Sequence, residues 1–263
     1  MSTPEPAEIP LEGGRANVGR VVRIGDEVAR PVYPQTETVE HFLRFLRSKS
    51  IDFVPEPLGN DSQGRQRLTF IEGRVPIAPH PAWAYDADLL ADVARRQRQL
   101  HLAVVDYVPP ADAVWAVSAG DYFPSDADGD LVCHNDLGLA NTIVDMGQPA
   151  VTGFIDFDYC RPVNRLFDIA VTARHWVPFG SLDMAQPLDL DRVGRFHRFC
   201  DAHELDASER SDVVDLAIAF LEHARRNITR LAADGNPGFV ELMANGYAET
   251  NKATIDWIRT TLA

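Results

Sequence analysis

The chain has 263 residues, of which 45% are hydrophobic and 24% are charged, so it can form one large globular domain or two lobes that share a cleft. Its formal net charge of -14 disfavours nucleic acid as a partner, because an acidic surface repels phosphates. No apolar run approaches the ~20 residues that cross a bilayer. Residues 1–10 also lack the basic start and apolar stretch of a secretory signal, so we expect a cytoplasmic protein without a membrane partner.

The first third of the chain has the pattern of short strands and one helix. Residues 12–19 form a turn-rich glycine segment, and 21–24 and 27–30 read as the two strands of a hairpin. Residues 36–48 predict a helix, because their apolar positions recur at helical spacing. A second hairpin is expected within residues 58–71.

From about residue 87 the pattern changes to long amphipathic helices. The expected helical stretches cover residues 86–105, 189–204, 208–232 and 237–262. An order of strands plus one helix, followed mainly by helices, is typical of the α+β class. We therefore predict a small β-rich N-lobe over residues 1–74 and a larger, mainly helical C-lobe over residues 75–263.

The cysteines and lysines are few. Cys133, Cys160 and Cys200 are far apart and form no C-x-x-C pair, which argues against a disulfide framework and a structural zinc site. We expect Cys133 and Cys160 to be buried free thiols. Lysine occurs only at Lys49 and Lys252, so arginine carries nearly all of the positive charge.

The strongest motif lies in residues 131–144, where a polar loop separates two apolar runs. The loop carries His134, Asp136 and Asn141, and an aspartate followed by asparagine five positions later has the spacing of a kinase catalytic loop. Phosphoryl transfer needs a carboxylate that orients the attacking hydroxyl and accepts its proton, and an oxygen ligand for magnesium. We assign these roles to Asp136 and Asn141, and we expect His134 to order the loop.

A second motif follows in residues 151–158, an apolar strand that ends in acids. Asp156 is placed to hold magnesium on the phosphates of a nucleotide, in the position of the kinase D-F-G aspartate. Asp158 stands where that motif has glycine, and it fits a second metal ligand, a substrate contact or a solvated loop acid. Each motif alone is common by chance, but the ordered set predicts a phosphotransferase site.

On these motifs the chain resembles the aminoglycoside phosphotransferase and choline kinase family. Residues 134–141 resemble the family's H-G-D-x-x-x-x-N segment, with Asn135 where glycine is commoner, and residues 154–158 resemble its I-D-[FW] segment. Asp168 matches the aspartate that supports the catalytic loop. The likeness follows the order of elements over nearly the whole chain and is specific over about 131–170.

The resemblance implies a two-lobed protein-kinase-like fold with ATP between the lobes and Mg²⁺ on its phosphates. The loop over the phosphates would then include Gly13, Gly14 and Asn17, although its spacing fits a simple hairpin turn equally well. The lysine expected on the next strand is absent. Arg30 is the cation at that place, and arginine can hold phosphate bidentately.

Two further contacts follow from the resemblance. A helix glutamate is expected to pair with the cation of this strand; Glu40 is assigned this supporting role, with Glu37 as the alternative. A hinge over residues 69–73 is expected to bond adenine through its backbone, at Phe70 and Ile71.

The function that these assignments predict is ATP- and magnesium-dependent transfer of the γ-phosphoryl group to a hydroxyl of a small molecule, such as an aminoglycoside, an amino-alcohol or a sugar. The acceptor would lie against the helices of residues 180–263, where acids suit a cationic molecule but also occur on ordinary exposed helix faces. These acids are Asp183, Asp189, Asp191, Glu222, Glu241 and Glu249.

Two alternatives stay open. A catalytically weak pseudokinase is favoured by the missing lysine and the irregular glycine loop. A metal-dependent hydrolase would use His134, Asp136 and Asp156 as metal ligands. The sequence decides neither the oligomeric state nor whether ATP or GTP is the donor.

Overall fold

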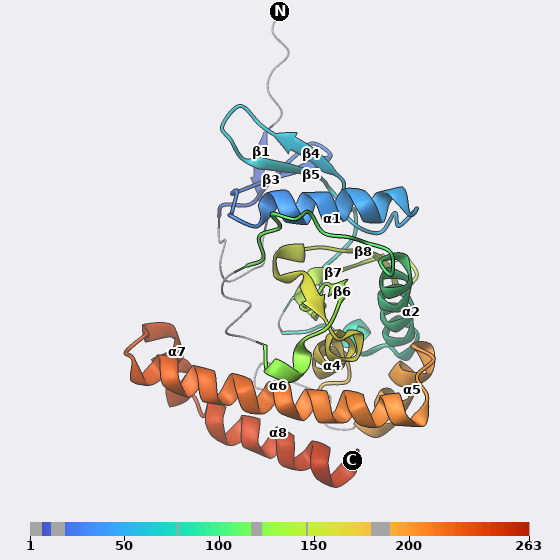
Figure 1. The fold of residues 1–263 in the computed structure, drawn as a ribbon, viewed down its shortest axis with the longest axis vertical. Coiled ribbons are helices and arrows are strands. Elements are labelled where there is room, and N and C mark those ends of the chain that lie inside the picture. The colour runs from blue at the N-terminus through green and yellow to red at the C-terminus, as the bar shows by residue number, and fades with distance from the viewer. Residues whose placement is uncertain are drawn as a thin grey trace, which may run out of the picture.

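The computed structural model describes residues 7–11, 19–77, 79–116, 123–145, 147–179 and 190–262. A small antiparallel sheet with one helix lies above a larger, mainly helical part (Figure 1). The predicted α+β class and two-lobed architecture are therefore confirmed.

The N-terminal sheet has five short strands in the order β1-β2-β3-β5-β4, and all of its pairings are antiparallel. The strands are β1 (Glu8–Pro10), β2 (Val22–Ile24), β3 (Glu27–Arg30), β4 (Pro57–Asn60) and β5 (Gln66–Thr69). The β2–β3 turn contains Gly25 at φ 62, a left-handed conformation that glycine adopts without steric cost. Both predicted hairpins are present.

Helix α1 (Thr36–Ser48) covers one side of this sheet. Its predicted apolar stripe is buried, at Val39, Phe42, Leu43 and Leu46. The Thr36 hydroxyl accepts the amide of residue 33 at 2.8 Å from within the first turn, so it fixes the entry of the chain without being the cap residue itself.

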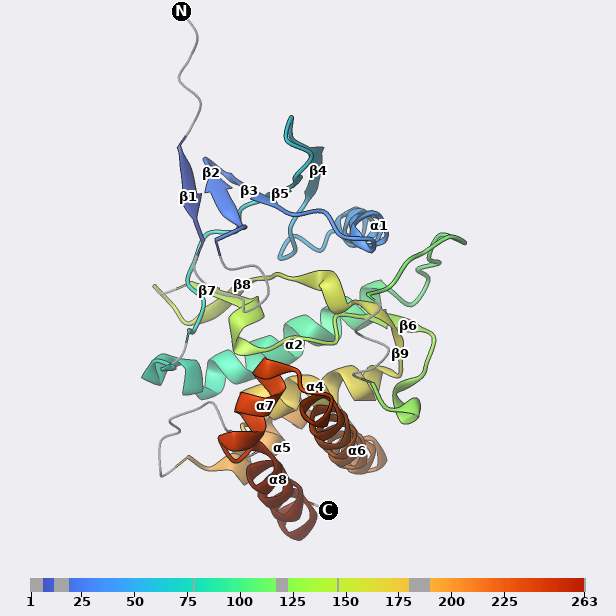
Figure 2. The same cartoon turned by 90° about the vertical axis from the view of Figure 1, so that its left-hand side faces the viewer.

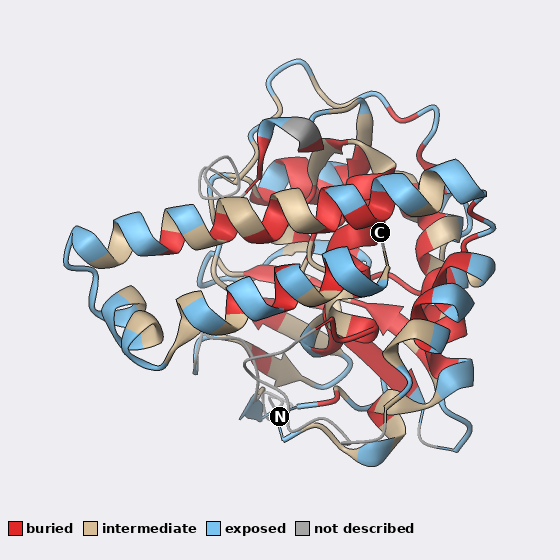
Figure 3. Ribbon diagram, turned by 90° about the horizontal axis from the view of Figure 1, so that it is seen from below, coloured by how far each residue is buried: buried red, intermediate tan, exposed pale blue. Residues whose placement is uncertain are grey.

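The C-terminal part is a layered set of helices. They are α2 (Ala87–Ala103), α4 (Arg165–Trp176), α5 (Arg192–Ala202), α6 (Ala207–Ala233), α7 (Pro237–Ala244) and α8 (Tyr247–Thr261). Figure 2 shows α2 and α4 in the interior, with α6 and α8 on the far side from the N-terminal sheet. Seen from below, the outer surfaces of these helices are exposed and their inner surfaces are buried (Figure 3).

Two details of the helices differ from the prediction. Helix α4 was not expected, and the single stretch predicted over 237–262 is two helices. The break follows Asn245 at Gly246, which has φ 82 and so ends α7 in the left-handed conformation that favours glycine.

Two small two-stranded sheets lie between the N-terminal sheet and the helices. Strand β6 (Leu131–Cys133) pairs with β9 (Arg161–Val163), and β7 (Thr142–Asp145) pairs with β8 (Ala150–Phe154). The polar loop of residues 134–141 joins β6 to β7, and residues 155–160 join β8 to β9. The two predicted motifs therefore connect the same two sheets, and this brings them together.

The two lobes share a continuous core of buried apolar side chains. Cys133, Cys160 and Cys200 are buried free thiols, as expected for the first two. None of the helices in the described part of the chain combines the length and the apolar character that a bilayer crossing requires.

Candidate active site

Asp136 and Asn141 are in direct contact in the loop between β6 and β7. The Asn141 side-chain amide donates to the Asp136 backbone carbonyl at 2.8 Å and to the Asp136 carboxylate at 2.9 Å. The spacing of five residues allows this contact because a 3₁₀ turn over Leu139–Asn141 folds the asparagine back toward the aspartate. The asparagine oxygen is left as an acceptor.

His134 links this loop to the second motif. Its Nε2 donates to the Ile155 carbonyl at 2.9 Å, and its Nδ1 accepts the Asp136 amide at 3.2 Å. Both bonds fit one neutral tautomer, and burial lowers the pKa of His134, which favours the neutral ring. The Ile155 amide also donates to the Asn141 carbonyl at 3.0 Å. These bonds place the residue before Asp156 beside the loop that carries Asp136.

Asp156 completes a group of three oxygen-bearing side chains. It has φ 63, a left-handed conformation that aspartate, like asparagine, adopts more readily than most residues. Its Oδ1 is buried, makes no hydrogen bond to the described residues, and lies 3.6 Å from Arg30 Nη1. The charge of Asp156 also acts on Asp136. Two carboxylates and an amide oxygen are a donor set that Mg²⁺ fits.

The environment of Asp136 brings the pKa of its carboxyl group close to neutral pH. Burial raises its pKa from 3.8 to about 7, and the neighbouring charge of Asp156 adds to this effect. Arg174 and the hydrogen bond from Asn141 work in the opposite direction. A carboxylate with a pKa near 7 can accept a proton at neutral pH and release it afterwards.

Asp168, on helix α4, supports the loop of residues 134–141: its carboxylate bonds one residue of the loop and two residues of helix α2. Its Oδ1 accepts the Asn135 amide at 2.6 Å, and its Oδ2 accepts Gln97 Nε2 and His101 Nε2, each at 2.7 Å. Burial opposes the charge, but the hydrogen bond and charge of His101 and the bond from Gln97 lower the pKa of Asp168. The structure thus brings Asp168 to the loop.

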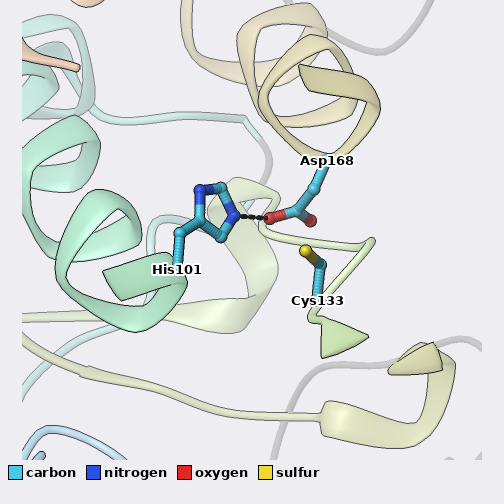
Figure 4. Close-up of side chains that lie close together, drawn as sticks. All are labelled: His101, Cys133 and Asp168. Atoms are coloured by element: carbon cyan, nitrogen blue, oxygen red, sulfur yellow. Dashed lines mark hydrogen bonds and ion pairs between the residues drawn. The ribbon is translucent and has the colours of Figure 1, made fainter. Parts of the chain in front are cut away.

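His101, Cys133 and Asp168 point toward one another in this buried cluster (Figure 4), and their ligand atoms lie within 4.8 Å. Burial and the charge of Asp168 raise the pKa of the Cys133 thiol well above its usual value. A metal needs the thiolate, and the Asp168 oxygens already accept three hydrogen bonds. We interpret the cluster as a brace for the catalytic loop.

Asn135 contributes both its conformation and its side chain. It has φ 64, which asparagine tolerates better than most residues, so it can replace the commoner glycine. Its Nδ2 donates to the carbonyls of Cys133 at 3.0 Å and Tyr159 at 3.1 Å, and so joins the loop to the segment after Asp156. The sequence did not reveal this second role, nor those of Gln97 and His101, because nothing local marks their partners.

The predicted phosphate-holding residues are only partly within the described chain. Gly13, Gly14 and Asn17 lie outside the described residues. Arg30, at the end of β3, is buried and contacts Asp158 and Asp156. Burial works against its charge, but these two carboxylates raise the pKa of Arg30 above its usual value, so it stays a cation.

The expected pairing of Arg30 with a glutamate of α1 is not the one that the structure shows. Glu40 accepts Arg44 Nη2 at 2.7 Å and Gln66 Nε2 at 3.1 Å, and Arg30 turns to Asp158 instead. Gln66, on the neighbouring strand, and Arg44, on α1, are the hydrogen-bond partners of Glu40 in the structure.

The predicted hinge follows β5. The Phe70 amide donates to the Asp26 carbonyl at 2.8 Å, so an adenine contact in this segment has to use another backbone group. Ile71 lies against Gly153 on β8: a Cβ at Gly153 would come 2.6 Å from Ile71 Cδ1. Only glycine allows this close approach between the hinge and the β7–β8 hairpin.

The last turn of α4 packs against the loop next to Asp136. Trp176 Nε1 donates to the Leu137 carbonyl at 3.1 Å, and the His175 ring lies 3.5 Å from the position of a Cβ at Gly138. Arg174 Nη2 lies 2.8 Å from His175 Nε2, and burial together with Arg174 lowers the pKa of His175 well below its usual value. This side of the loop therefore carries a positive charge.

The acids proposed for an acceptor pocket are not assembled there by the structure. Asp183 and Asp189 lie outside the described residues. Asp191 caps α5 by accepting the Gly194 amide at 2.8 Å, and Glu222 is paired with arginines 226 and 259. Glu241 and Glu249 are exposed on α7 and α8.

Comparisons with known proteins agree with the sequence resemblance. Residues 79–190 match the model of a phosphotransferase enzyme family. A choline/ethanolamine kinase family protein from Mesorhizobium loti has a similar structure, with a TM-score of 0.64 and 18% identity over 97% of this chain and 92% of the other. The chain thus has the protein-kinase-like fold of small-molecule kinases, and its likeness to the phosphotransferase family is confirmed.

Two further structures are similar. An aminoglycoside phosphotransferase from Streptomyces rimosus, in complex with ADP and streptomycin, has a TM-score of 0.55 and 17% identity over 81% of this chain and 92% of the other. Amicoumacin kinase in complex with AMP-PNP, Ca²⁺ and amicoumacin has a TM-score of 0.62 and 11% identity over 97% of this chain and 92% of the other. No curated protein matches the chain.

Proposed function

We propose that the protein is an ATP- and magnesium-dependent phosphotransferase that moves the γ-phosphoryl group to a hydroxyl of a small molecule. The observation that supports this proposal most directly is the contact between Asp136 and Asn141, together with the bond from the Ile155 amide to the Asn141 carbonyl, which holds the residue before Asp156 beside the same loop. The family match over residues 79–190 and the nucleotides present in the two similar kinases support it.

Each side chain has a distinct task in this mechanism. Asp136 orients the acceptor hydroxyl and accepts its proton, for which a pKa of about 7 suits it. Asn141 and Asp156, whose Oδ1 makes no hydrogen bond to the described residues, would hold magnesium, which neutralises the phosphate charge when bound. Arg30 contributes a buried positive charge for the non-transferred phosphates.

The acceptor class stays open between cationic and neutral molecules. The acidic composition favours a cation, and several similar kinases act on amines or aminoglycosides by their names. Arg174 lies on the side of the loop where a positively charged group close to the reacting hydroxyl would be repelled. An acceptor whose amine is remote from its hydroxyl, or a neutral sugar, avoids that repulsion.

The metal-dependent hydrolase is disfavoured by His134. Both of its ring nitrogens are engaged, one with the Ile155 carbonyl and one with the Asp136 amide, so neither is available to a metal. A pseudokinase is disfavoured because the three groups expected to act on phosphate and hydroxyl are all present, with Asn141 bonded to Asp136 and the charge of Asp156 acting on Asp136.

The first test is a thermal melt of the purified chain with ATP, with Mg²⁺ and with both, because a ligand that binds only the folded state raises the midpoint. A shift that needs both, followed by ATP consumption with a panel of amino-alcohols, aminoglycosides and sugars, supports the proposal. Asp136→Asn should then retain the nucleotide-induced shift and lose the transfer. If neither ATP nor GTP shifts the midpoint at millimolar concentration, the phosphotransferase proposal fails.

A further inference from the structure

Arg30 is anchored from the opposite lobe. It is only 8% exposed, its Nη2 donates to Asp158 Oδ2, and its Nη1 lies 3.6 Å from Asp156 Oδ1. Asp158 is 128 residues away in the sequence and lies in the turn that follows β8. Arg30 Nε is buried and has no hydrogen-bond partner among the described residues, so a ligand would have to be met by the N–H groups of Nη1 and Nη2 that Asp158 does not occupy.

The glutamate that would otherwise serve as the anchor is already engaged. Gln66 stands opposite Arg30 in the β3–β5 ladder, and directly opposed residues project from the same face of an antiparallel sheet. From this position Gln66 Nε2 donates to Glu40 Oε1 at 3.1 Å, while Arg44 takes Oε2 at 2.7 Å. Both oxygens of Glu40 therefore bond residues of the N-lobe other than Arg30.

We propose that Asp158 is the positioning residue for Arg30, so that the phosphate-binding cation of this protein is oriented by a carboxylate two residues after Asp156 and not by helix α1. This inference rests on the proposed function. It explains how an arginine can stand on the strand where the related family has a lysine. The guanidinium group carries several N–H donors in one plane, so one of them can bond Asp158 while others face the phosphates. Because Asp156 and Asp158 share one short turn, the cation and the proposed metal ligand are held by the same piece of backbone.

The alternative is that Asp158 merely closes the cleft and competes with the nucleotide for Arg30. The two cases differ in the sign of one measurement. Removing the charge of a positioning residue weakens nucleotide binding, because Arg30 loses its orientation. Removing the charge of a competitor strengthens nucleotide binding, because Arg30 is released.

The experiment measures the affinity of the full chain for AMP-PNP with Mg²⁺ by calorimetry, in the wild type and in three variants. We expect Asp158→Asn to weaken binding about tenfold, the size expected for a lost hydrogen bond to a charged group. Asp158→Glu, which restores the charge, should recover a large part of this loss. Glu40→Gln is the matched control and should change the affinity less than about twofold, since it alters a carboxylate that does not contact Arg30.

A second readout needs no nucleotide. Urea unfolding of Arg30→Met, Asp158→Asn and the double variant should be non-additive, because the two side chains contact each other directly. Additive effects, an unchanged or tighter affinity of Asp158→Asn, or a large loss in Glu40→Gln would each overturn the proposal. A wild type that binds no nucleotide defeats the proposed function as well, whereas a wild type that binds normally with an unaffected Asp158→Asn defeats this inference alone.

Discussion

Asp136→Asn should make the protein more stable and inactive at the same time. Burial and the charge of Asp156 raise the pKa of Asp136 from 3.8 to about 7, so above pH 7 the folded protein holds an ionised carboxylate that it disfavours. At about 1.4 kcal/mol for each pKa unit between the two values, the cost is about 4 kcal/mol. Asparagine removes the charge, and its amide oxygen can still accept the hydrogen bond from Asn141.

The sign of the pH dependence is fixed by the raised pKa. The stability that protonated Asp136 contributes is fully present below about pH 4 and is lost as the pH rises through about 7. The difference in unfolding free energy between Asp136→Asn and the wild type should therefore be close to zero near pH 4 and grow to about 4 kcal/mol at pH 8.

Urea unfolding at a series of pH values measures this difference, and ATP consumption at pH 8 measures the loss of transfer. Asp212→Asn is the matched control, because Asp212 is exposed on α6; it should stay within about 0.5 kcal/mol of the wild type at every pH. A variant that is less stable than the wild type at pH 8, or a difference that does not depend on pH, would refute the reasoning from burial and charge repulsion.

Three further predictions concern the support of the site. Asp168→Asn should lower the free energy of unfolding by about 3 kcal/mol, because it leaves buried hydrogen-bond donors without a matched acceptor. Since the pKa of Asp168 is lowered, this loss should shrink as the pH falls below about 4. A loss that persists at low pH in urea unfolding would contradict this. Asn135→Gly keeps the backbone conformation but removes the side-chain hydrogen bonds to the carbonyls of Cys133 and Tyr159. Steady-state kinetics should then show a lower kcat at unchanged KM for ATP. An unchanged kcat would show that the protein does not need these two hydrogen bonds for catalysis. Gly129→Ala places a Cβ 2.4 Å from the Asn164 backbone nitrogen and should lower the free energy of unfolding by about 2–4 kcal/mol. Gly238→Ala is the control: its nearest contact would be at 3.9 Å, so it should not change the free energy of unfolding. Equal effects of the two substitutions would exclude steric overlap as the cause.

Much of the N-lobe could be predicted because its signals are local. The β2–β3 hairpin is marked by its glycine turn, and α1 has the predicted bounds, since its apolar residues recur on one face of the helix. Helix α4 escaped prediction because it is buried on nearly all sides, so it shows no clear polar face. The break between α7 and α8 depends on a single glycine after Asn245, which the helical pattern on either side concealed.

In the site, the sequence alone indicated the residues to which we assign the chemistry, and the tertiary structure decided how they are held. The spacing of Asp136, Asn141 and Asp156 is a local property of two loops, and it was sufficient to predict a phosphotransferase. The partner of Arg30 was not predictable, because several acids could pair with it, and the structure pairs it with Asp158 while Glu40 bonds Gln66 across the β3–β5 ladder. A sequence shows which charges exist; only packing decides which of them meet, because buried charges must find their partners wherever the fold places them.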